Sequence, residues 1–162
     1  VRKDFTFRQP LNAIDMALAN KLKQETSVSV HIRRGDYIKE RRRADYEVCT
    51  AEYYRRAVAY IQAQVDSPVF YVFSDDPTWG QEQNIFPKDT IFVSGHEGAD
   101  AYIDMQLMSL CCHHVIANSS FSWWGAWLGQ HENTITLAPS TWFRYRERPD
   151  IIPDNWIKID AE

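Results

Sequence analysis

Short runs of strand-forming residues alternate along this chain with longer amphipathic segments, and this alternation limits the folds open to it. The expected strands cover residues 28–33, 69–73, 90–93, 115–117 and 134–137, and a further short strand can form within 156–159. The expected helices lie between them, over residues 10–22, 50–64, 79–84, 100–113 and 121–129. Such alternation predicts an α/β fold with a mainly parallel sheet and helices on both faces.

Residues with capping preferences mark where several expected helices begin and end. Pro10 is placed to open the first helix, because its fixed φ suits the first helical turn. Thr50 and Asp100 can cap two later helices through their side-chain oxygens, and Gly129 suits the end of the last helix. No repeat or low-complexity linker divides the sequence, so we expect residues 1–162 to form a single Rossmann-like domain.

The charge and the cysteine content argue against some classes of protein. The net charge is −4 at pH 7, whereas nucleic-acid-binding domains are usually basic. Three cysteines are too few for a disulfide framework, which fits a reducing compartment. No apolar run approaches the ~18 residues of a membrane-spanning helix, and the first residues lack a signal-peptide pattern. We therefore expect a soluble chain, while an anchor elsewhere in a longer protein stays open.

Polar clusters follow three of the expected strands, and ligands of parallel sheets bind outside the carboxyl ends of the strands. The first cluster runs from His31 to Asp36 and holds two adjacent arginines, Arg33 and Arg34. Arginine suits a pyrophosphate because its planar fork donates two parallel hydrogen bonds. Structural ion pairs with acidic neighbours are the alternative role for both arginines.

The other two clusters carry carboxylates and hydroxyls. Asp75 and Asp76 follow the second strand, where a carboxylate can accept hydrogen bonds from guanine or ribose, and an Asp-Asp-Pro turn is the alternative. The third cluster, before the last helix, consists of Asn118, Ser119, Ser120 and Ser122. Backbone N–H groups and hydroxyls at a helix start can bind phosphate, and plain capping is the alternative. Together the three clusters predict a nucleotide ligand that carries phosphate.

Other conspicuous residues have structural explanations. The run at residues 111–114 holds two cysteines and two histidines, but successive helical residues point about 100° apart and cannot all reach one metal ion. Trp123, Trp124 and Trp127 recur at helical spacing, which favours core packing over a platform for sugars. The sequence lacks a G-x-x-x-x-G-K loop, a G-x-G-x-x-G fingerprint and an Asp-x-Asp pair. An ordinary NTPase, a dinucleotide enzyme and a metal-bound nucleotide-sugar site are therefore disfavoured.

Three motifs resemble those of glycosyltransferase family 11, the family of α-1,2-fucosyltransferases. Residues 31–37 (H-x-R-R-x-D-Y) resemble its first motif, which is shared with related α-1,6- and protein O-fucosyltransferases. Residues 104–128, which include N-S-S-F-S-W-W-x-A-W-L, resemble a longer and more specific motif. Residues 72–79 (V-F-S-D-D, then a tryptophan) resemble a third. The similarity spans residues 28–140.

The resemblance implies the architecture and the reaction of that family. This chain would be the C-terminal, donor-binding half of a GT-B enzyme, in which two Rossmann-like domains face each other. GDP-fucose would be the donor, and fucose would pass with inversion to the 2-hydroxyl of a terminal galactose, without a metal ion or another cofactor. Only residues 1–27 precede the first expected strand, so we expect the acceptor-side domain to be absent and this chain alone to be inactive.

The resemblance also implies roles at the phosphate. Arg33 or Arg34 would hold the β-phosphate of the donor, together with Ser120 and neighbouring amides. Both arginines would then stabilise the charge that develops on the leaving GDP. Asp36 and Asp104 would be outer carboxylates that orient the arginines. Asp36 is also a weak candidate for the base, which makes it, with the two arginines, an expected catalytic residue.

The remaining expectations concern the guanosine and the partners. His31, with Asp75 or Asp76, would address the guanosine. The partners implied are GDP-fucose and a galactose-terminated glycan, with no nucleic acid. Bacterial members act in the cytoplasm on lipopolysaccharide or capsule glycans, which implies a cytoplasmic protein that can touch the inner membrane peripherally. Two alternatives stay open: another fucosyltransferase of the HxRRxD group, α-1,6 or protein O-, and a non-catalytic module that binds glycans through its tryptophans.

Overall fold

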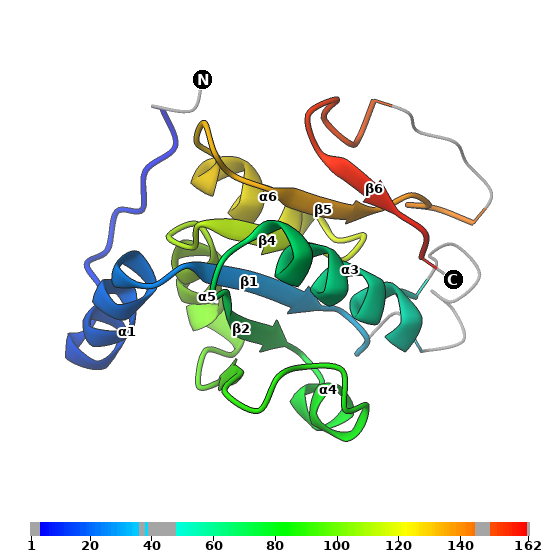
Figure 1. Cartoon of the computed structure of the whole chain (residues 1–162). Coiled ribbons are helices and arrows are strands. Elements are labelled where there is room, and N and C mark those ends of the chain that lie inside the picture. The colour runs from blue at the N-terminus through cyan, green and yellow to red at the C-terminus, as the bar shows by residue number, and fades with distance from the viewer. Residues whose placement is uncertain (1–3, 36–37, 39–47, 145–149, 162) are drawn as a thin grey trace.

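Figure 1 shows the computed structural model of the chain, which describes residues 4–35, 38, 48–144 and 150–161. Asp36, an expected catalytic residue, lies outside these residues. The strands of the sheet are β1 (Ser27–Ile32), β2 (Val69–Ser74), β3 (Ile91–Val93), β4 (His113–Val115), β5 (Thr136–Pro139) and β6 (Ile157–Ile159). They lie in the order β3-β2-β1-β4-β5-β6, and every neighbouring pair is parallel. This is the strand order of dinucleotide-binding Rossmann folds.

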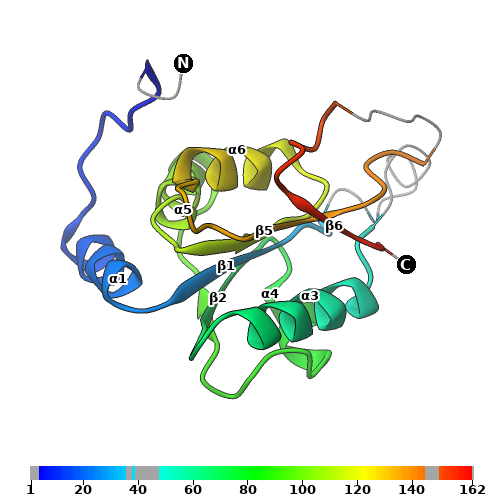
Figure 2. The same cartoon turned by 45° about the horizontal axis from the view of Figure 1, so that its top comes forward.

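Helices cover both faces of this sheet, as Figures 1 and 2 show. One face carries α3 (Ala51–Gln64) and α4 (Pro77–Glu82). The other face carries α1 (Ala13–Gln24), α5 (Ala101–Met108) and α6 (Ser120–Gly129). The predicted α/β class is therefore confirmed, and the domain is consistent with one half of a GT-B glycosyltransferase.

Alternate residues of a strand point to opposite faces of the sheet, so each face has its own core. Val30 and Ile32 of β1 are fully buried in a cluster with Tyr54 of α3. Tyr71 of β2 is buried on the other side, in a cluster with Leu107 of α5. All residues of β1 are buried, because helices cover this central strand on both sides.

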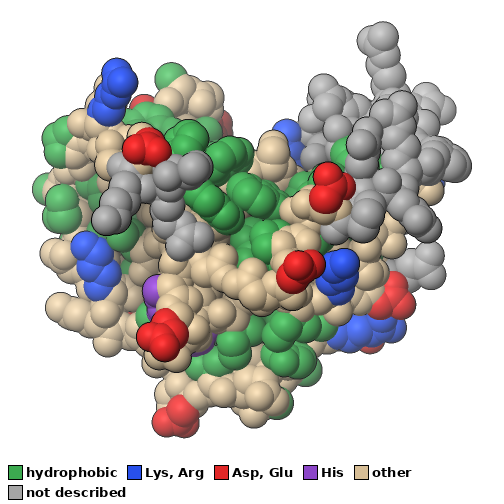
Figure 3. Space-filling model, turned by 90° about the horizontal axis from the view of Figure 1, so that it is seen from above, with side chains coloured by type: hydrophobic (Ala, Val, Ile, Leu, Met, Phe, Trp, Pro, Cys, Tyr) green, Lys and Arg blue, Asp and Glu red, His purple; other side chains and the backbone are tan. Residues whose placement is uncertain are grey.

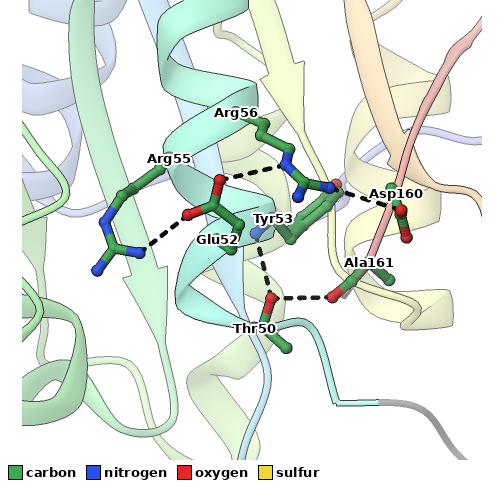
Figure 4. Close-up of polar contacts among 7 residues, drawn as sticks. All are labelled: Thr50, Glu52, Tyr53, Arg55, Arg56, Asp160 and Ala161. Carbon is green, nitrogen blue, oxygen red and sulfur yellow. Dashed lines mark hydrogen bonds and ion pairs between the residues drawn. The ribbon is translucent and has the colours of Figure 1, made fainter.

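The start of α3 is fixed as the sequence predicts. The Thr50 side chain accepts a hydrogen bond from the backbone N–H of Tyr53 at 3.2 Å and thereby caps the helix. The same hydroxyl donates to the carbonyl oxygen of Ala161, 3.0 Å away (Figure 4). The cap therefore also ties α3 to the chain that follows β6.

Two other helices begin differently from the prediction. α1 starts at Ala13 rather than at Pro10, because the Asn12 side chain caps it by accepting the N–H of Asp15 at 2.9 Å. Asn is among the preferred capping residues. Asp100 makes no capping hydrogen bond with its side chain, because residues 98–100 form a 3-10 turn ahead of α5.

The predicted helix over residues 100–113 is too long. α5 ends at Met108, and β4 begins at His113. The N–H of Cys112 bonds to the carbonyl of Ser27 in β1 at 2.9 Å, which draws this part of the chain into the sheet. Apolar residues continue at helical spacing beyond Met108, so periodicity alone misplaces the boundary. The fifth strand was expected over residues 134–137, and β5 lies two residues further along, over Thr136–Pro139.

Trp123 and Trp127 of α6 belong to a third apolar cluster, beside β5 and β6, whereas Trp124 packs against Phe5. Trp123 and Trp127 stack with ring centroids 6.0 Å apart, and Trp123 donates from Nε1 to the carbonyl of Ile151 at 2.8 Å. Both rings pack against a core that includes Trp156. Figure 3 looks from above onto the side where β6 lies and shows apolar side chains gathered near its middle. This packing supports the core role for Trp123 and Trp127, and Trp124 does not belong to this cluster.

Candidate functional site

A cavity of about 730 Å³ opens at the carboxyl ends of the central strands. Its lining includes members of all three predicted polar clusters, namely His31, Arg33, Ser74, Asp75, Ser119 and Ser120. The segments that follow β1 and β4 meet here, and the strand order reverses between these two neighbours. Ligands of open parallel sheets bind at such switch points. The volume suits a nucleotide, because small-molecule pockets usually span about 300–1,000 Å³.

Asp75 anchors Arg33 at the wall of this cavity. The Arg33 guanidinium lies 3.1 Å from Oδ2 of Asp75, and 35% of its side chain is exposed. The same carboxylate accepts hydrogen bonds from the backbone N–H groups of Arg34 and Gly35, at 2.9 and 3.0 Å. A Cβ on residue 35 would lie 2.7 Å from Oδ2 of Asp75, which explains the glycine at that position. Asp75 thus fixes the loop after β1, and Arg33 adds positive charge to the cavity wall.

Arg34 has different surroundings from Arg33. Its guanidinium carbon lies 4.2 Å from the centre of the Trp79 ring, a cation–π contact, and its Nε lies 3.5 Å from Oδ2 of Asp76. Asp76 also caps α4 by accepting the N–H of Trp79 at 3.2 Å. Neither Arg34 nor Asp76 belongs to the described lining of the cavity. Both arginines therefore pair with acidic neighbours, the alternative that the sequence left open, but only Arg33 also reaches the cavity.

His31 lines the cavity from the end of β1 and is only 5% exposed. Burial, and then the positive charge of Arg33, lower the pKa of His31 to about 3, so the ring is neutral near pH 7. Its Nδ1 atom is buried without a hydrogen-bond partner among the residues that the structure describes. Phe121 packs against the ring, with centroids 5.4 Å apart. A buried polar atom without a partner is unfavourable.

The amino end of α6 borders the same cavity. Ser119 precedes the helix, Ser120 begins it, and both line the cavity. The first backbone N–H groups of an α-helix lack partners within the helix, and the Ser119 side chain does not cap them. The helix dipole adds a partial positive charge at this end. Arg33 and the start of α6 together therefore suit a phosphate group.

Asn118 and Ser122 have structural surroundings instead of the predicted contact with a ligand. The Ser122 hydroxyl is fully buried and donates toward the carbonyls of Ala117 and Ser119, each 3.3 Å away. Asn118 is 1% exposed, and its Nδ2 donates to the carbonyl of Trp142 at 2.9 Å. Neither residue is part of the described cavity lining. Short polar side chains near a helix start often satisfy backbone groups in this way.

Asp104 lines the cavity, but the described contacts of its carboxylate are with a histidine rather than with an arginine. Its Oδ1 lies 2.6 Å from Nδ1 of His96, which belongs to the loop between β3 and α5. Nε2 of His96 lies 3.0 Å from Oδ1 of Asp15 in α1. The described contacts thus join Asp104 to His96, and its predicted role in orienting the arginines stays a prediction.

His96 was not among the predicted site residues. Burial alone lowers its pKa, but the hydrogen bonds and charges of Asp104 and Asp15 outweigh burial and raise the pKa above its ordinary value. A signal was present, because the polar, glycine-rich residues 94–98 follow the third strand as the other clusters follow theirs. His96 therefore adds a fourth polar segment at the carboxyl edge of the sheet.

The cysteines and histidines at residues 111–114 are dispersed by the fold. His113 and His114 are adjacent in β4 and point to opposite faces of the sheet. His113 accepts the N–H of Ile135 at Nδ1, 3.0 Å away, and Nδ1 of His114 pairs with the Ser29 hydroxyl at 2.8 Å. Across the part of the chain that the structure describes, no group of three or more Cys, His, Asp or Glu could hold a metal ion. Within the same part, none of the helices has the length and apolarity that crossing a bilayer requires.

The fold and the cavity define a Rossmann-like domain with an arginine at its switch point, the arrangement of a nucleotide-binding domain. The chain belongs to glycosyltransferase family 11, because the family model described as Glycosyl transferase family 11 matches residues 5–160. This match confirms the resemblance that the sequence motifs indicate.

Three curated relatives show what this chain is similar to. It is 41% identical to an alpha-1,2-colitosyltransferase of Escherichia coli, over 88% of the chain and 51% of the relative. It is 37% identical to the O-antigen biosynthesis glycosyltransferase WbnK of Escherichia coli, over 82% of the chain and 44% of the relative. It is 26% identical to galactoside alpha-(1,2)-fucosyltransferase 1 of Saimiri boliviensis boliviensis, over 100% of the chain and 48% of the relative. The chain thus spans about half the length of these relatives.

Proposed function

We propose that this chain is the donor-binding part of a galactoside α-1,2-fucosyltransferase. The enzyme would transfer L-fucose from GDP-fucose, with inversion, to the 2-hydroxyl of a terminal galactose in a glycan. The observation that carries the proposal is the single cavity shared by Arg33 and the start of α6 at the switch point of the sheet. Membership of the family supports glycosyl transfer, and the name of the primate relative supports fucose and galactose.

The phosphate end of the cavity supplies the chemistry in this proposal. Breaking the bond between fucose and GDP leaves negative charge on the β-phosphate. Arg33, held by Asp75, and the N–H groups at Ser120 stabilise that charge where it develops. Removing one such donor raises the barrier by about 3–4 kcal/mol in comparable sites. Because protein donors carry this load, we propose that no metal ion takes part.

In this proposal His31 forms hydrogen bonds with the guanosine. With a pKa of about 3 its ring is neutral near pH 7, so one nitrogen can donate a hydrogen bond and the other can accept one. His31 lines the cavity, so its ring can contact the nucleoside there. Asp75 is already engaged by Arg33 and by two backbone N–H groups. We therefore assign Asp75 to positioning Arg33 rather than to the guanine edge.

A different deoxy sugar on the same nucleotide is the second candidate. The chain is 41% identical to a colitosyltransferase but 26% identical to the primate fucosyltransferase. Colitose lacks one ring hydroxyl that fucose carries. A site built to bind that hydroxyl rejects the analogue strongly, whereas a site that does not bind it accepts both sugars. GDP-colitose and GDP-fucose should therefore be compared directly.

Calorimetric titration of the chain tests the proposal. The affinities for GDP and for GDP-fucose should each be the same with EDTA as without it. GDP-mannose should bind more weakly than GDP-fucose, and UDP-galactose should give no signal. Tighter binding of GDP-colitose than of GDP-fucose would favour the second candidate. Failure to bind GDP would contradict the proposal, and binding of a galactose-terminated glycan without a GDP signal would instead support a glycan-binding module.

We further propose a cytoplasmic setting, with peripheral contact to the inner membrane, where the enzyme modifies a bacterial surface glycan. The name of the O-antigen biosynthesis relative supports this setting. Fractionation of cells that produce the protein tests it, since salt should release the membrane-bound portion if the contact is peripheral.

A further inference from the structure

His96 connects three separate segments of the fold at one wall of the cavity. Its Nδ1 contacts Asp104 of α5 at 2.6 Å, and its Nε2 contacts Asp15 of α1 at 3.0 Å. The side chains of His96, Asp15 and Asp104 are only 9%, 5% and 17% exposed. Asp15 is itself held, because its Oδ2 accepts a hydrogen bond from Nδ2 of Asn12 at 2.6 Å. Both nitrogens of the His96 ring are thus engaged by anchored carboxylates.

The loop that carries His96 has few other means of support. Residues 94–98 line the cavity consecutively, and all of them except His96 are exposed. Gly95 and Gly98 have φ angles of +102° and +59°, which side-chain-bearing residues rarely adopt. A Cβ at either glycine would meet nothing within 4 Å, so backbone conformation rather than packing requires them. The position of this wall therefore depends on the His96 side chain.

The chemistry of this group suits positioning better than stability or proton transfer. Burying charged groups is unfavourable even when they are paired, so an apolar side chain would stabilise the same space at least as well. A base must have a nitrogen that is open to its substrate, but both His96 nitrogens already contact carboxylates. The remaining role for His96 is to fix the position of its loop through directional contacts with the two carboxylates.

We propose that His96 is a positioning residue for the donor: held between Asp15 and Asp104, it fixes the residue 94–98 wall of the cavity in the shape that the nucleotide-sugar meets. This inference rests on the proposed function. Asp15 does not belong to the described lining of the cavity. An effect of Asp15 on donor binding must therefore be indirect, and His96 is the cavity-lining residue that its carboxylate contacts.

Asp15→Ala is the test, with two matched variants. Asp15→Asn keeps an oxygen that can accept from His96, and Thr50→Ala removes a helix cap at α3, outside the cavity lining. NMR order parameters of the amides at residues 94–98 measure the rigidity of the wall without a ligand, and GDP calorimetry measures the donor site. Asp15→Ala should lower these order parameters and weaken GDP binding by about tenfold. Asp15→Asn should restore GDP affinity to within about threefold of the wild type.

Thr50→Ala should lower the melting temperature and leave both measurements unchanged. The inference is overturned if Asp15→Ala weakens GDP binding no more than Thr50→Ala does, or if the order parameters at residues 94–98 do not change. If Asp15→Ala does not fold, His96→Gln replaces it, because glutamine cannot bridge both carboxylates and should loosen the wall in the same way. A wild-type chain that binds no GDP would end the proposed function alone, since the comparison of order parameters still decides whether His96 holds the wall.

Discussion

Two groups of arginines and carboxylates in this domain look alike in composition and differ in their surroundings. At the cavity, Arg33 pairs with Asp75 at 3.1 Å. At the start of α3, Glu52 pairs with Arg55 and Arg56, at 3.2 Å each (Figure 4). Residue types and distances alone do not distinguish the two groups.

Their surroundings separate them. Asp75 also accepts two backbone N–H groups, its side chain is 25% exposed, and it borders a cavity. Glu52 and Arg55 are 48% and 49% exposed and lie one helical turn apart on the surface of α3. Exposed pairs of this kind contribute little, because water screens them and ordering two long side chains costs entropy. An ion pair thus indicates function here only where one partner is anchored and the other meets a cavity.

Arg33→Ala should have the largest effect of the variants considered, and the effect should be on turnover. In the full-length enzyme we expect turnover at saturating donor to fall about 100-fold or more, because one donor to the leaving phosphate is lost. Arg34→Ala should have a smaller effect, since Arg34 contacts Trp79 and Asp76 rather than the cavity. Steady-state kinetics of both variants provide the measurement. Near-normal turnover of Arg33→Ala would remove the phosphate role, and equal losses would mean that the structure does not distinguish the two arginines.

Asp75→Ala should act through Arg33 and through the loop after β1. Two backbone N–H groups and a guanidinium lose their common acceptor, and hydrogen bonds to charged groups contribute about 2 kcal/mol. GDP affinity, measured by calorimetry, should therefore fall about thirtyfold. Asp160→Ala, which removes an exposed partner of Arg56, is the control and should leave GDP affinity unchanged. An unaltered affinity in Asp75→Ala would mean that Arg33 needs no anchor.

Acid should destabilise the fold through His31, which lines the cavity. The ion-pair group at the start of α3 contains no histidine and should not contribute to this effect. The folded chain holds the pKa of His31 at about 3, below its ordinary value of 6.5. Between these values the unfolded chain binds a proton that the folded chain excludes, so stability falls as pH drops through this window. One such group contributes up to about 1.4 kcal/mol per pH unit. His31→Asn should reduce the pH slope of the unfolding free energy by that amount, as urea titrations at several pH values would show, and an unchanged slope would contradict the burial of a neutral His31.

The fold was largely predictable because its signals are local. Apolar runs at β1 and β2 and amphipathic helices between strands are what a doubly covered parallel sheet requires. Boundaries were less predictable where two tendencies compete. Beyond Met108 the residues keep a helical period, yet pairing with β1 prevails and starts β4 at His113. That choice depends on a strand distant in sequence, which local patterns do not report.

The position of the candidate site at the carboxyl edge of the sheet was predictable, but the individual residues that line the cavity were not all predictable. Arg33 and Ser119 were expected at the cavity and lie there, whereas Ser122 of the same cluster turns to backbone carbonyls. A short polar side chain near a helix start can serve either purpose. His96 was not predicted because its role depends on a contact with Asp15, which is distant in the sequence. Contacts of this kind exist only once the sheet has brought α1 beside the loop after β3.

Glu52→Ala gives the smallest expected effect and is the strictest check on the comparison. It removes two surface ion pairs and an acidic residue from the first turn of α3, where the helix dipole favours negative charge. The unfolding free energy should fall by less than about 1 kcal/mol, which is a melting-temperature shift of about 2–4 °C at most for a chain of this size. GDP affinity should not change, because α3 contributes no residue to the described cavity lining. If Glu52→Ala weakened GDP binding as Asp75→Ala is expected to, anchoring and cavity contact would no longer distinguish the two groups, and the assignment of Arg33 to the phosphate would lose its structural basis.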